Sequence, residues 1–429
     1  MHYVDQEKAL LNKNPQSNTV APTRNPSFAC RSCRSVSAVP FLDLGVMPLT
    51  SHLMSGYPIQ DAIPLATMYC ENCHLVQIRE SVSPERLYHQ EYPYYSSYSQ
   101  ELLRHSRAHA LALKQRLQLS PQSFVVEVAS NDGYLLQYFQ QDGIPCLGID
   151  PAPGPGKVAQ EKGIATITGF FSHSAAQDLK KEFGSADLIL ANNVVAHVED
   201  INDFVAGLSH LLATDGMVSM EFAYVRDLVD DCLFDTIYHE HLFYYSLASI
   251  ERLLNRHGLF VHDVERIPIH GGSLRVYAGK DPNEGASVGK LRAAEENAGM
   301  YLKEFYLGFT QRVQSVLARL DLFLKNAEES GARVAGYGAA AKGIILLNAL
   351  KRGHFLEFVV DRNVHKQGKS MPGVNIPIKP VEVLLDEMPD YCLILPWNFR
   401  NEIVEQQADY IDRGGSFVIP LPELEVISN

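Results

Sequence analysis

The sequence predicts an α/β protein of three parts: a small cysteine-bearing module, a central Rossmann-like domain and a second Rossmann-like α/β domain at the C-terminal end. Two Cys-x-x-Cys pairs mark the first part. Two blocks of short apolar runs alternating with helical periodicity mark the other two, and such alternation is typical of doubly wound parallel sheets. A chain of 429 residues is long enough for two or three hydrophobic cores.

The expected boundaries follow changes in sequence pattern. The start of the chain is polar and has no periodicity, and a polar helical stretch over residues 289–329 separates the two alternating blocks. The predicted parts are a flexible tail (1–27), the cysteine module (28–100), the central domain (101–285) and the C-terminal domain (286–429). A helix is expected over 101–119, with strands over 124–129, 145–150, 187–191, 216–222, 333–337, 355–361, 390–395 and 415–420.

Composition excludes several classes of function. A net charge of -13, without a basic stripe, disfavours nucleic acid as a partner. The apolar stretch over 334–350 is interrupted by glycine and lysine and falls short of the about 18 residues that cross a bilayer, so we expect no membrane span. The N-terminus also lacks the apolar core of a signal peptide. Scattered cysteines in apolar context indicate a reducing compartment, and we expect a cytoplasmic protein.

The two cysteine pairs predict a zinc site. Cys30 with Cys33, and Cys70 with Cys73, each form a knuckle that presents two thiolates to one tetrahedral zinc ion. The 36 residues between the pairs exceed the usual separation, so the insert over 39–68 must fold back on itself. Four thiolates leave no open coordination position, which makes one structural zinc the expectation. Redox dithiols, isolated buried thiols, or His74 replacing one cysteine are the alternatives.

The turn after the first central strand, residues 127–133 (EVASNDG), indicates a cofactor site. It has one glycine instead of the three of a dinucleotide fingerprint, and Glu127 and Asp132 would repel a pyrophosphate. Asp150 ends the next strand, seventeen residues after Gly133, where a carboxylate can accept both ribose hydroxyls. S-adenosylmethionine fits, and a turn without a cofactor is the alternative. The candidate cofactor-binding residues are Glu127, Ala129, Ser130, Asn131, Gly133, Asp150, Asn192 and Asn193.

The segment Tyr238-His239-Glu240-His241 concentrates groups that transfer protons near neutral pH. If it were helical, Tyr238 and His241 would share one face. The two histidines stand at i, i+2, whereas a His-Glu-x-x-His metalloprotease needs i, i+4. A hydrated helix face or a different metal site are the alternatives.

These motifs together resemble the sugar C-methyltransferases of deoxysugar biosynthesis, over roughly residues 28 to 425. The resemblance rests on the cysteine pairs with residues 74–77 (HLVQ), the turn over 129–133, the segment over 238–241, and residues 270–275 (HGGSLR) and 336–343 (GYGAAAKG). Such enzymes methylate the carbon beside the keto group of a nucleoside-diphosphate 4-keto-6-deoxyhexose, commonly at C3. The resemblance implies the same reaction here: removal of the α-proton, stabilisation of the enolate, and methylation from S-adenosylmethionine.

The resemblance also implies roles for single residues. His241 is the general base with Tyr238 and Glu240 beside it, His239 is the competing base, and His197 contacts the keto oxygen. In the C-terminal domain, Gly336 and Gly338 offer backbone amides and Lys342 a cation to the diphosphate, unless the glycines only serve close packing. The aromatic run over 88–98, with Tyr92 and Tyr95, closes over that diphosphate or packs as a linker.

Two other functions compete with this one. An NAD-dependent sugar-nucleotide oxidoreductase or epimerase would use the Gly336 turn, but the third glycine and a Tyr-x-x-x-Lys pair are missing. A non-catalytic zinc-ribbon scaffold has no physical need for the cluster over 238–241. The nucleotide base, the methylated carbon and the oligomeric state are not decided by the sequence.

Overall fold

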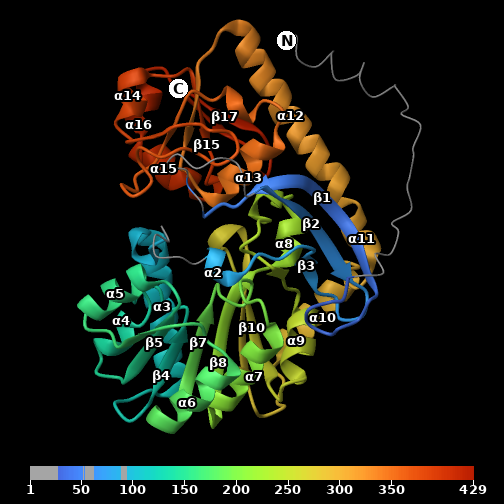
Figure 1. The fold of residues 1–429 in the computed structure, drawn as a ribbon, viewed down its shortest axis with the longest axis vertical. Coiled ribbons are helices and arrows are strands. Elements are labelled where there is room, and N and C mark those ends of the chain that lie inside the picture. Colours follow the sequence, from blue (N-terminus) through green and yellow to red (C-terminus); the bar gives the residue numbers. More distant parts are fainter. Residues whose placement is uncertain (1–27, 52, 54–61, 88–93) are drawn as a thin grey trace.

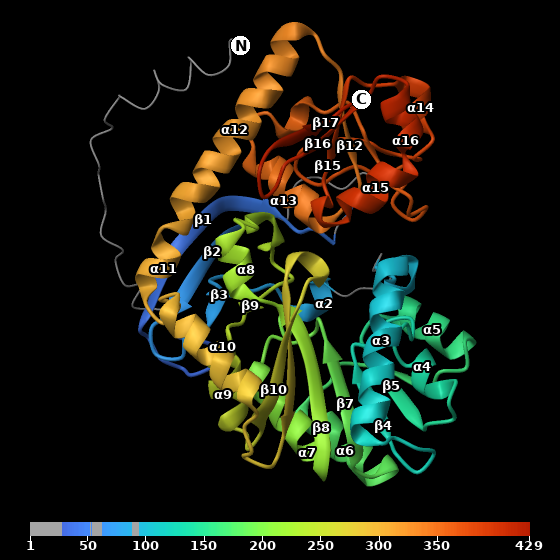
Figure 2. The same ribbon diagram turned by 180° about the vertical axis from the view of Figure 1, so that it is seen from behind.

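Three β-sheets organise the chain in the computed structural model, which describes residues 28–51, 53, 62–87 and 94–429. The predicted tail and Tyr92 lie outside the described residues. Figures 1 and 2 show the C-terminal domain at one end, the central domain at the other, and the strands of the cysteine module along one side of both. Among the described helices, none is both long and apolar enough to cross a membrane.

The cysteine module is a four-stranded sheet of order β1-β2-β3-β9. The insert between the cysteine pairs folds back on itself, as predicted, because β1 pairs antiparallel with β2 from Ala38 opposite Cys70 to Pro48 opposite Ala62. The last strand belongs to the central domain by sequence, so the module is joined to that domain by main-chain hydrogen bonds. The elements are β1 (Ala38–Pro48), β2 (Ala62–Cys70), β3 (Val76–Ile78), α2 (Pro84–Leu87), η1 (Ser96–Tyr98) and β9 (Phe243–Tyr244).

The central domain is a seven-stranded sheet of order β10-β11-β8-β7-β4-β5-β6, in which the last five strands are parallel and β11 pairs antiparallel with β8 and β10. Its first helix is capped by the Ser99 hydroxyl, which accepts from the Leu102 amide, and ends at Gln118 in the left-handed region. The elements are α3 (Gln100–Leu117), β4 (Val125–Val128), α4 (Gln137–Gln140), β5 (Cys146–Asp150), α5 (Pro153–Glu161), β6 (Thr166–Thr168), α6 (His173–Phe183), β7 (Ala186–Asn192), α7 (Ile201–Leu211), β8 (Leu212–Ala223), α8 (Val225–Asp230), η2 (Phe234–Thr236), α9 (Leu247–Asn255), β10 (Phe260–Ile267), η3 (Ile269–Gly271) and β11 (Ser273–Gly279).

The C-terminal domain is a six-stranded sheet of order β14-β13-β12-β15-β16-β17, parallel except for β17. The helical stretch expected over 289–329 is divided into α10, α11 and α12, and the last of these runs alongside β1 in both views (Figures 1 and 2). The elements are α10 (Ala286–Asn297), α11 (Lys303–Leu307), α12 (Phe309–Ser330), β12 (Val334–Tyr337), α13 (Ala341–Ala349), η4 (Gly353–Phe355), β13 (Val359–Val360), β14 (Ile378–Lys379), α14 (Val383–Glu387), β15 (Tyr391–Ile394), η5 (Trp397–Phe399), α15 (Arg400–Gln406), α16 (Ala408–Asp412), β16 (Ser416–Ile419) and β17 (Glu425–Ile427).

The eight predicted strands correspond to β4, β5, β7, β8, β12, β13, β15 and β16. The strand expected over 355–361 is reduced to Val359–Val360, because the residues before it form a short 3-10 helix. The strands that were not predicted include short edge strands with a weak apolar signal, such as β6 and β17, and also longer strands such as β2, β10 and β11.

Candidate active site

The catalytic candidates lie in a turn between η2 and β9. The helix considered for this segment does not form: the His241 amide donates to the Tyr238 carbonyl at 2.9 Å, which closes a single turn. This turn still brings the two side chains together, because the Tyr238 hydroxyl lies 2.9 Å from His241 Nε2 and their ring centroids are 4.0 Å apart. The pairing expected from i, i+3 spacing therefore arises without a helix.

The other ring nitrogen of His241 sets its tautomer. Nδ1 lies 2.9 Å from the Thr236 carbonyl oxygen, which can only accept, so Nδ1 carries the proton and Nε2 accepts from the Tyr238 hydroxyl. Burial lowers the pKa of His241 well below its usual value, and the neighbouring His197 and Lys342 act in the same direction. At neutral pH this imidazole is therefore neutral, with Nε2 unprotonated and hydrogen-bonded to Tyr238.

His197 stands across from His241, with ring centroids 4.8 Å apart in an edge-to-face arrangement. Its Nδ1 lies 2.6 Å from the Glu240 carbonyl oxygen and donates to it. Burial lowers the pKa of His197. Because Nδ1 is already a donor, this ring can give a second hydrogen bond only as imidazolium, and negative charge developing beside it would favour that form.

Glu240 and His239 face the cysteine module. Glu240 Oε1 accepts from the Thr50 hydroxyl and the Ser51 amide, both at 2.9 Å, and Oε2 is buried without a partner among the described residues. The His239 ring is fully buried, with Nε2 3.3 Å from the Pro64 carbonyl oxygen. His241 and Tyr238 keep partial exposure, so they are the members of the segment that a ligand can reach.

The four knuckle cysteines form one cluster, with all sulfurs within 4.8 Å of one another. The Sγ atoms of Cys30 and Cys73, and of Cys33 and Cys70, are 3.6 Å apart. A tetrahedral site with Zn–S bonds of about 2.3 Å places its sulfurs about 3.8 Å apart, so the four thiolates fit one zinc ion. The second knuckle continues into His74, which lies outside the ligand cluster and whose Nδ1 lies 2.7 Å from the Tyr69 hydroxyl.

The cofactor candidates meet at one edge of the central sheet, where β4, β5 and β7 end. Three residues after β4 and β7 adopt left-handed backbone: Ala129 (φ 58°), Asn131 (φ 50°) and Asn193 (φ 53°). Strained backbone of this kind clusters at ligand sites. The segment before α3 lies against this turn, because the Asn131 side chain accepts from the Ser96 amide at 2.8 Å and donates to the Tyr94 carbonyl at 3.2 Å.

The acidic residues at this edge are fit to hold a ligand. Asp150 Oδ2 accepts from the Asn131 amide and Oδ1 from the Ala152 amide, each at 2.8 Å, which fixes the carboxyl orientation. Burial raises the pKa of Asp150 to about 6, although these amides oppose the shift. Glu127 is fully buried, and both its carboxyl oxygens lack a partner among the described residues, as do Ser130 Oγ and Asn192 Oδ1. Four buried oxygen atoms without partners would suit a ligand that offers hydrogen-bond donors.

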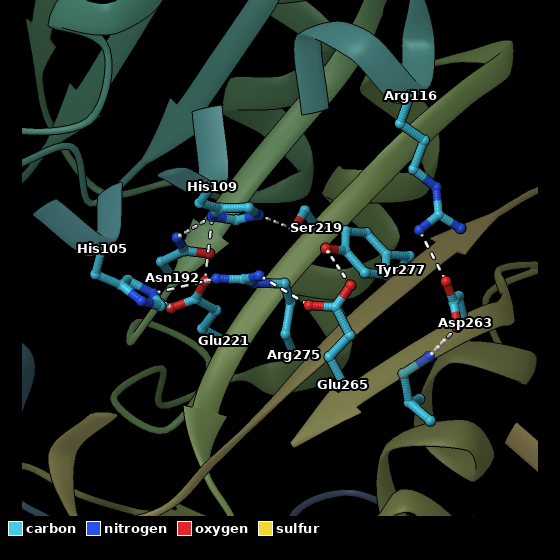
Figure 3. Close-up of polar contacts among 11 residues, drawn as sticks. His105, His109, Arg116, Asn192, Ser219, Glu221, Asp263, Glu265, Arg275 and Tyr277 are labelled. Carbon is cyan, nitrogen blue, oxygen red and sulfur yellow. Dashed lines mark hydrogen bonds and ion pairs between the residues drawn. The ribbon is translucent and has the colours of Figure 1, made fainter. Parts of the chain in front are cut away.

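A buried polar network supports the neighbouring strand ends (Figure 3). Glu221, at the end of β8, is contacted by His105 Nε2 at 2.8 Å and by Arg275 Nε at 2.7 Å. Burial raises the Glu221 pKa, but the His105 hydrogen bond and the Arg275 charge outweigh it and lower the pKa to about 2. His109 lies between Ser219 and Asn192, at 3.1 and 3.4 Å. The network ties α3 to the strand ends beside the cofactor candidates.

The glycine turn of the C-terminal domain approaches the catalytic segment. Gly338 (φ 85°) lies so close to Pro396 that an added Cβ would stand 2.6 Å from its ring, so packing alone accounts for this glycine. Lys342, at the start of α13, has its Nζ 3.0 Å from Asn398 Oδ1 and 4.4 Å from the Trp397 ring centroid, and its charge helps to lower the pKa of His241. Gly336 lies in β12 beside Val359.

Tyr95 lies at the same boundary between domains. Its ring stacks on Tyr98 and on His365 of the C-terminal domain, at centroid distances of 5.5 and 6.0 Å. The contact with His365 joins the segment before α3 to the C-terminal domain.

Three segments of the chain match family descriptions in the order expected from the motifs. Residues 30–88 match a "Putative zinc binding domain", residues 95–264 a "Methyltransferase domain" and residues 268–422 a "C-methyltransferase C-terminal domain". The C-methyltransferase NovU of Streptomyces niveus is 34% identical over 410 residues, which span 94% of this chain and 97% of NovU. The chain belongs to the S-adenosylmethionine-dependent C-methyltransferase family. The resemblance inferred from the motifs is thereby confirmed, and so are the expected methyl donor and zinc binding.

Similar solved structures each cover less than half of this chain. They include magnesium protoporphyrin IX methyltransferase from Synechocystis with bound S-adenosylmethionine (18% identity, 42% of this chain and 79% of that chain, TM-score 0.32). A TehB-like methyltransferase from Corynebacterium glutamicum is 16% identical over 41% of this chain and 88% of its own, with a TM-score of 0.31.

Sequence reasoning missed several residues around the segment. Thr50 and Ser51 lie far from it in sequence and carry no motif. Asp235 and Trp397 form a hydrogen bond beside it, and the only available signal was that Trp397 is the sole tryptophan. His270 was part of a recognised signature without an assigned role, and its φ of 59° marks it as a strained position.

Proposed function

We propose that this C-methyltransferase acts on a nucleoside-diphosphate 4-keto-6-deoxyhexose and methylates the carbon beside the keto group, at C3. The observation that carries the proposal is the chain of contacts from the Thr236 carbonyl through His241 to the Tyr238 hydroxyl, with His197 opposite. A neutral imidazole with one nitrogen fixed as donor and the other available to accept is what removal of an α-proton requires.

In this proposal His241 is the general base. Before the substrate binds, the Tyr238 hydroxyl donates a hydrogen bond to Nε2 and keeps the ring in place. When the substrate binds, this hydrogen bond breaks and Nε2 accepts the carbon-bound proton. His197 stabilises the enolate oxygen as imidazolium, since its neutral form has no second donor. Glu240, anchored by Thr50 and Ser51, orients the turn. His239 is the weaker candidate for the base because its ring is fully buried against the cysteine module.

S-adenosylmethionine supplies the methyl group, and its site is proposed at the edge formed by β4, β5 and β7. Asp150 would accept the ribose hydroxyls, and the buried Glu127 would face the positively charged part of the ligand. The remaining members of this proposed site are Ala129, Ser130, Asn131, Gly133, Asn192 and Asn193.

We assign the diphosphate to the C-terminal domain, with Lys342 as the cation. Gly336 and Gly338 contribute less, since close packing explains Gly338 and the Ala339 amide is already bonded to Asp361 at 2.7 Å. Tyr95, and Tyr92 by its place in the sequence, would close over the same group. A cytoplasmic location is proposed on the cysteines, none of which forms a disulfide.

The test is proton exchange without methylation. A panel of nucleoside-diphosphate 4-keto-6-deoxyhexoses is incubated in deuterium oxide with enzyme and S-adenosylhomocysteine, and deuterium at C3 is followed by NMR. We expect exchange in the wild type, a loss of about 10²-fold or more in His241→Ala, and a partial loss in His197→Ala. His239→Ala is the matched control, and a larger loss there than in His241→Ala would move the base to His239. Thermal stabilisation by NAD instead of S-adenosylhomocysteine would favour an oxidoreductase.

A further inference from the structure

Asp235 lies one residue before the carbonyl that orients the base. Its side chain is fully buried at the centre of η2. The adjacent Thr236 carbonyl oxygen accepts from His241 Nδ1 at 2.9 Å and from the Tyr244 hydroxyl at 3.3 Å. A movement of η2 would therefore change the acceptor that holds the proton on Nδ1 of His241.

The residue that holds Asp235 comes from the other Rossmann-like domain. Trp397, in η5 after β15, donates its indole N–H to Asp235 Oδ2 at 2.7 Å, across 162 positions of sequence. The other oxygen, Oδ1, is buried and has no partner among the described residues. Within the described part of the chain this indole is the one side-chain donor to the Asp235 carboxyl, so the contact fixes one of its two oxygens.

Trp397 is closely packed by residues of both domains. Gly271 (φ 92°) approaches so closely that an added Cβ would lie 2.7 Å from the Trp397 ring, and no larger residue fits there without displacing it. The Lys342 ammonium, from the same domain as Trp397, lies 4.4 Å from the ring centroid. Burial raises the pKa of Asp235 to about 6, while the Lys342 charge and the indole N–H act against that shift.

We propose that Asp235 is a positioning residue for the base and that Trp397 holds it across the boundary between domains. Docking of the C-terminal domain would then be required to fix the proton on Nδ1 of His241 and leave Nε2 as the acceptor. The inference rests on the proposed role of His241. It assigns the C-terminal domain a part in proton removal, in addition to binding the sugar nucleotide.

The first readout does not need a sugar substrate. Histidine-labelled (¹⁵N) full-length enzyme is observed by long-range ¹H–¹⁵N NMR, with His241→Gln to assign the signals. We expect the Nδ1–H tautomer of His241 in the wild type and a mixture of tautomers in Trp397→Phe, which keeps the ring on Lys342 but removes the donor. Tyr410→Phe is the matched control, because it also removes one buried donor of the C-terminal domain, the hydroxyl that bonds the Pro389 carbonyl at 2.7 Å. An unchanged His241 tautomer in Trp397→Phe would overturn the proposal.

The second readout is the exchange assay described above. Trp397→Phe and Asp235→Ala should each slow exchange about 10-fold or more, with the dissociation constant of S-adenosylhomocysteine unchanged. Because both remove the same contact, the double variant should be no slower than the worse single variant, whereas independent effects would multiply. Asp235→Asn keeps an acceptor for the indole and should restore the wild-type tautomer. The positioning role of Asp235 would be contradicted if the two losses of exchange rate multiplied in the double variant, or if Tyr410→Phe lost as much exchange as Trp397→Phe. Absence of exchange in the wild type would reject the proposed substrate while the tautomer still tests the contact.

Discussion

Cofactor affinity should increase with pH through the titration of Asp150. The backbone amides of Asn131 and Ala152 orient both carboxyl oxygens. Only the ionised carboxylate can then accept hydrogen bonds from two ribose hydroxyls. Because burial raises the Asp150 pKa to about 6, this form is lost over an accessible pH range. Lowering the pH should therefore weaken binding, and raising it above 7 should restore it.

The magnitude follows from the pKa and from the hydrogen bonds. At pH 5 about one tenth of the Asp150 carboxyls are ionised, so the dissociation constant should be about 10-fold larger than above pH 7. Asp150→Asn replaces one acceptor by a donor and loses at least one hydrogen bond to a charged group, worth about 1.5 to 3 kcal/mol. This corresponds to an about 10- to 150-fold larger dissociation constant at neutral pH.

The assay is titration calorimetry with S-adenosylhomocysteine from pH 5 to 8, on wild type and Asp150→Asn. The variant should bind weakly and show no pH dependence in this range. Glu127 is the other candidate for such a titration, because burial and the neighbouring Asp150 raise its pKa. A variant that keeps the wild-type slope would assign the titration to Glu127, and wild-type affinity in Asp150→Asn would refute the proposed ribose contact.

Two further predictions concern the cysteine module. Elemental analysis should find one zinc per chain. Because the site is structural, Cys70→Ser should lower the melting temperature more than it lowers the turnover of the enzyme that remains folded. A zinc-free preparation with the wild-type melting temperature would contradict this prediction. Thr50→Val removes a hydroxyl bonded to Glu240 and should lower kcat without changing cofactor affinity. Thr67→Val, which loses a buried hydrogen bond to the Leu42 carbonyl in the same module, should leave kcat unchanged, and equal losses in both variants would reject a specific role for Thr50.

The local sequence pattern was sufficient to predict many of the strands and the residue types of the candidate sites. Strands such as β4 and β5 are buried on both faces, so their continuous apolar runs stand out in sequence. The cysteine knuckles and the turn over 129–133 are short motifs whose function depends on neighbouring residues. Tyr238 and His241 are also local, which is why their pairing was expected even though the helix considered for it does not form.

Contacts between distant segments could not be predicted in the same way. The sequence by itself determined the family, the methyl donor, the two cysteine knuckles and the chemical groups over 238–241, because each of these motifs consists of residues within a few positions of one another. Only the tertiary structure decided that Glu240 is held by Thr50, that His197 faces His241, and that Trp397 bonds Asp235. These partners are separated by 190, 44 and 162 positions, and contacts across such separations leave no periodicity in the sequence.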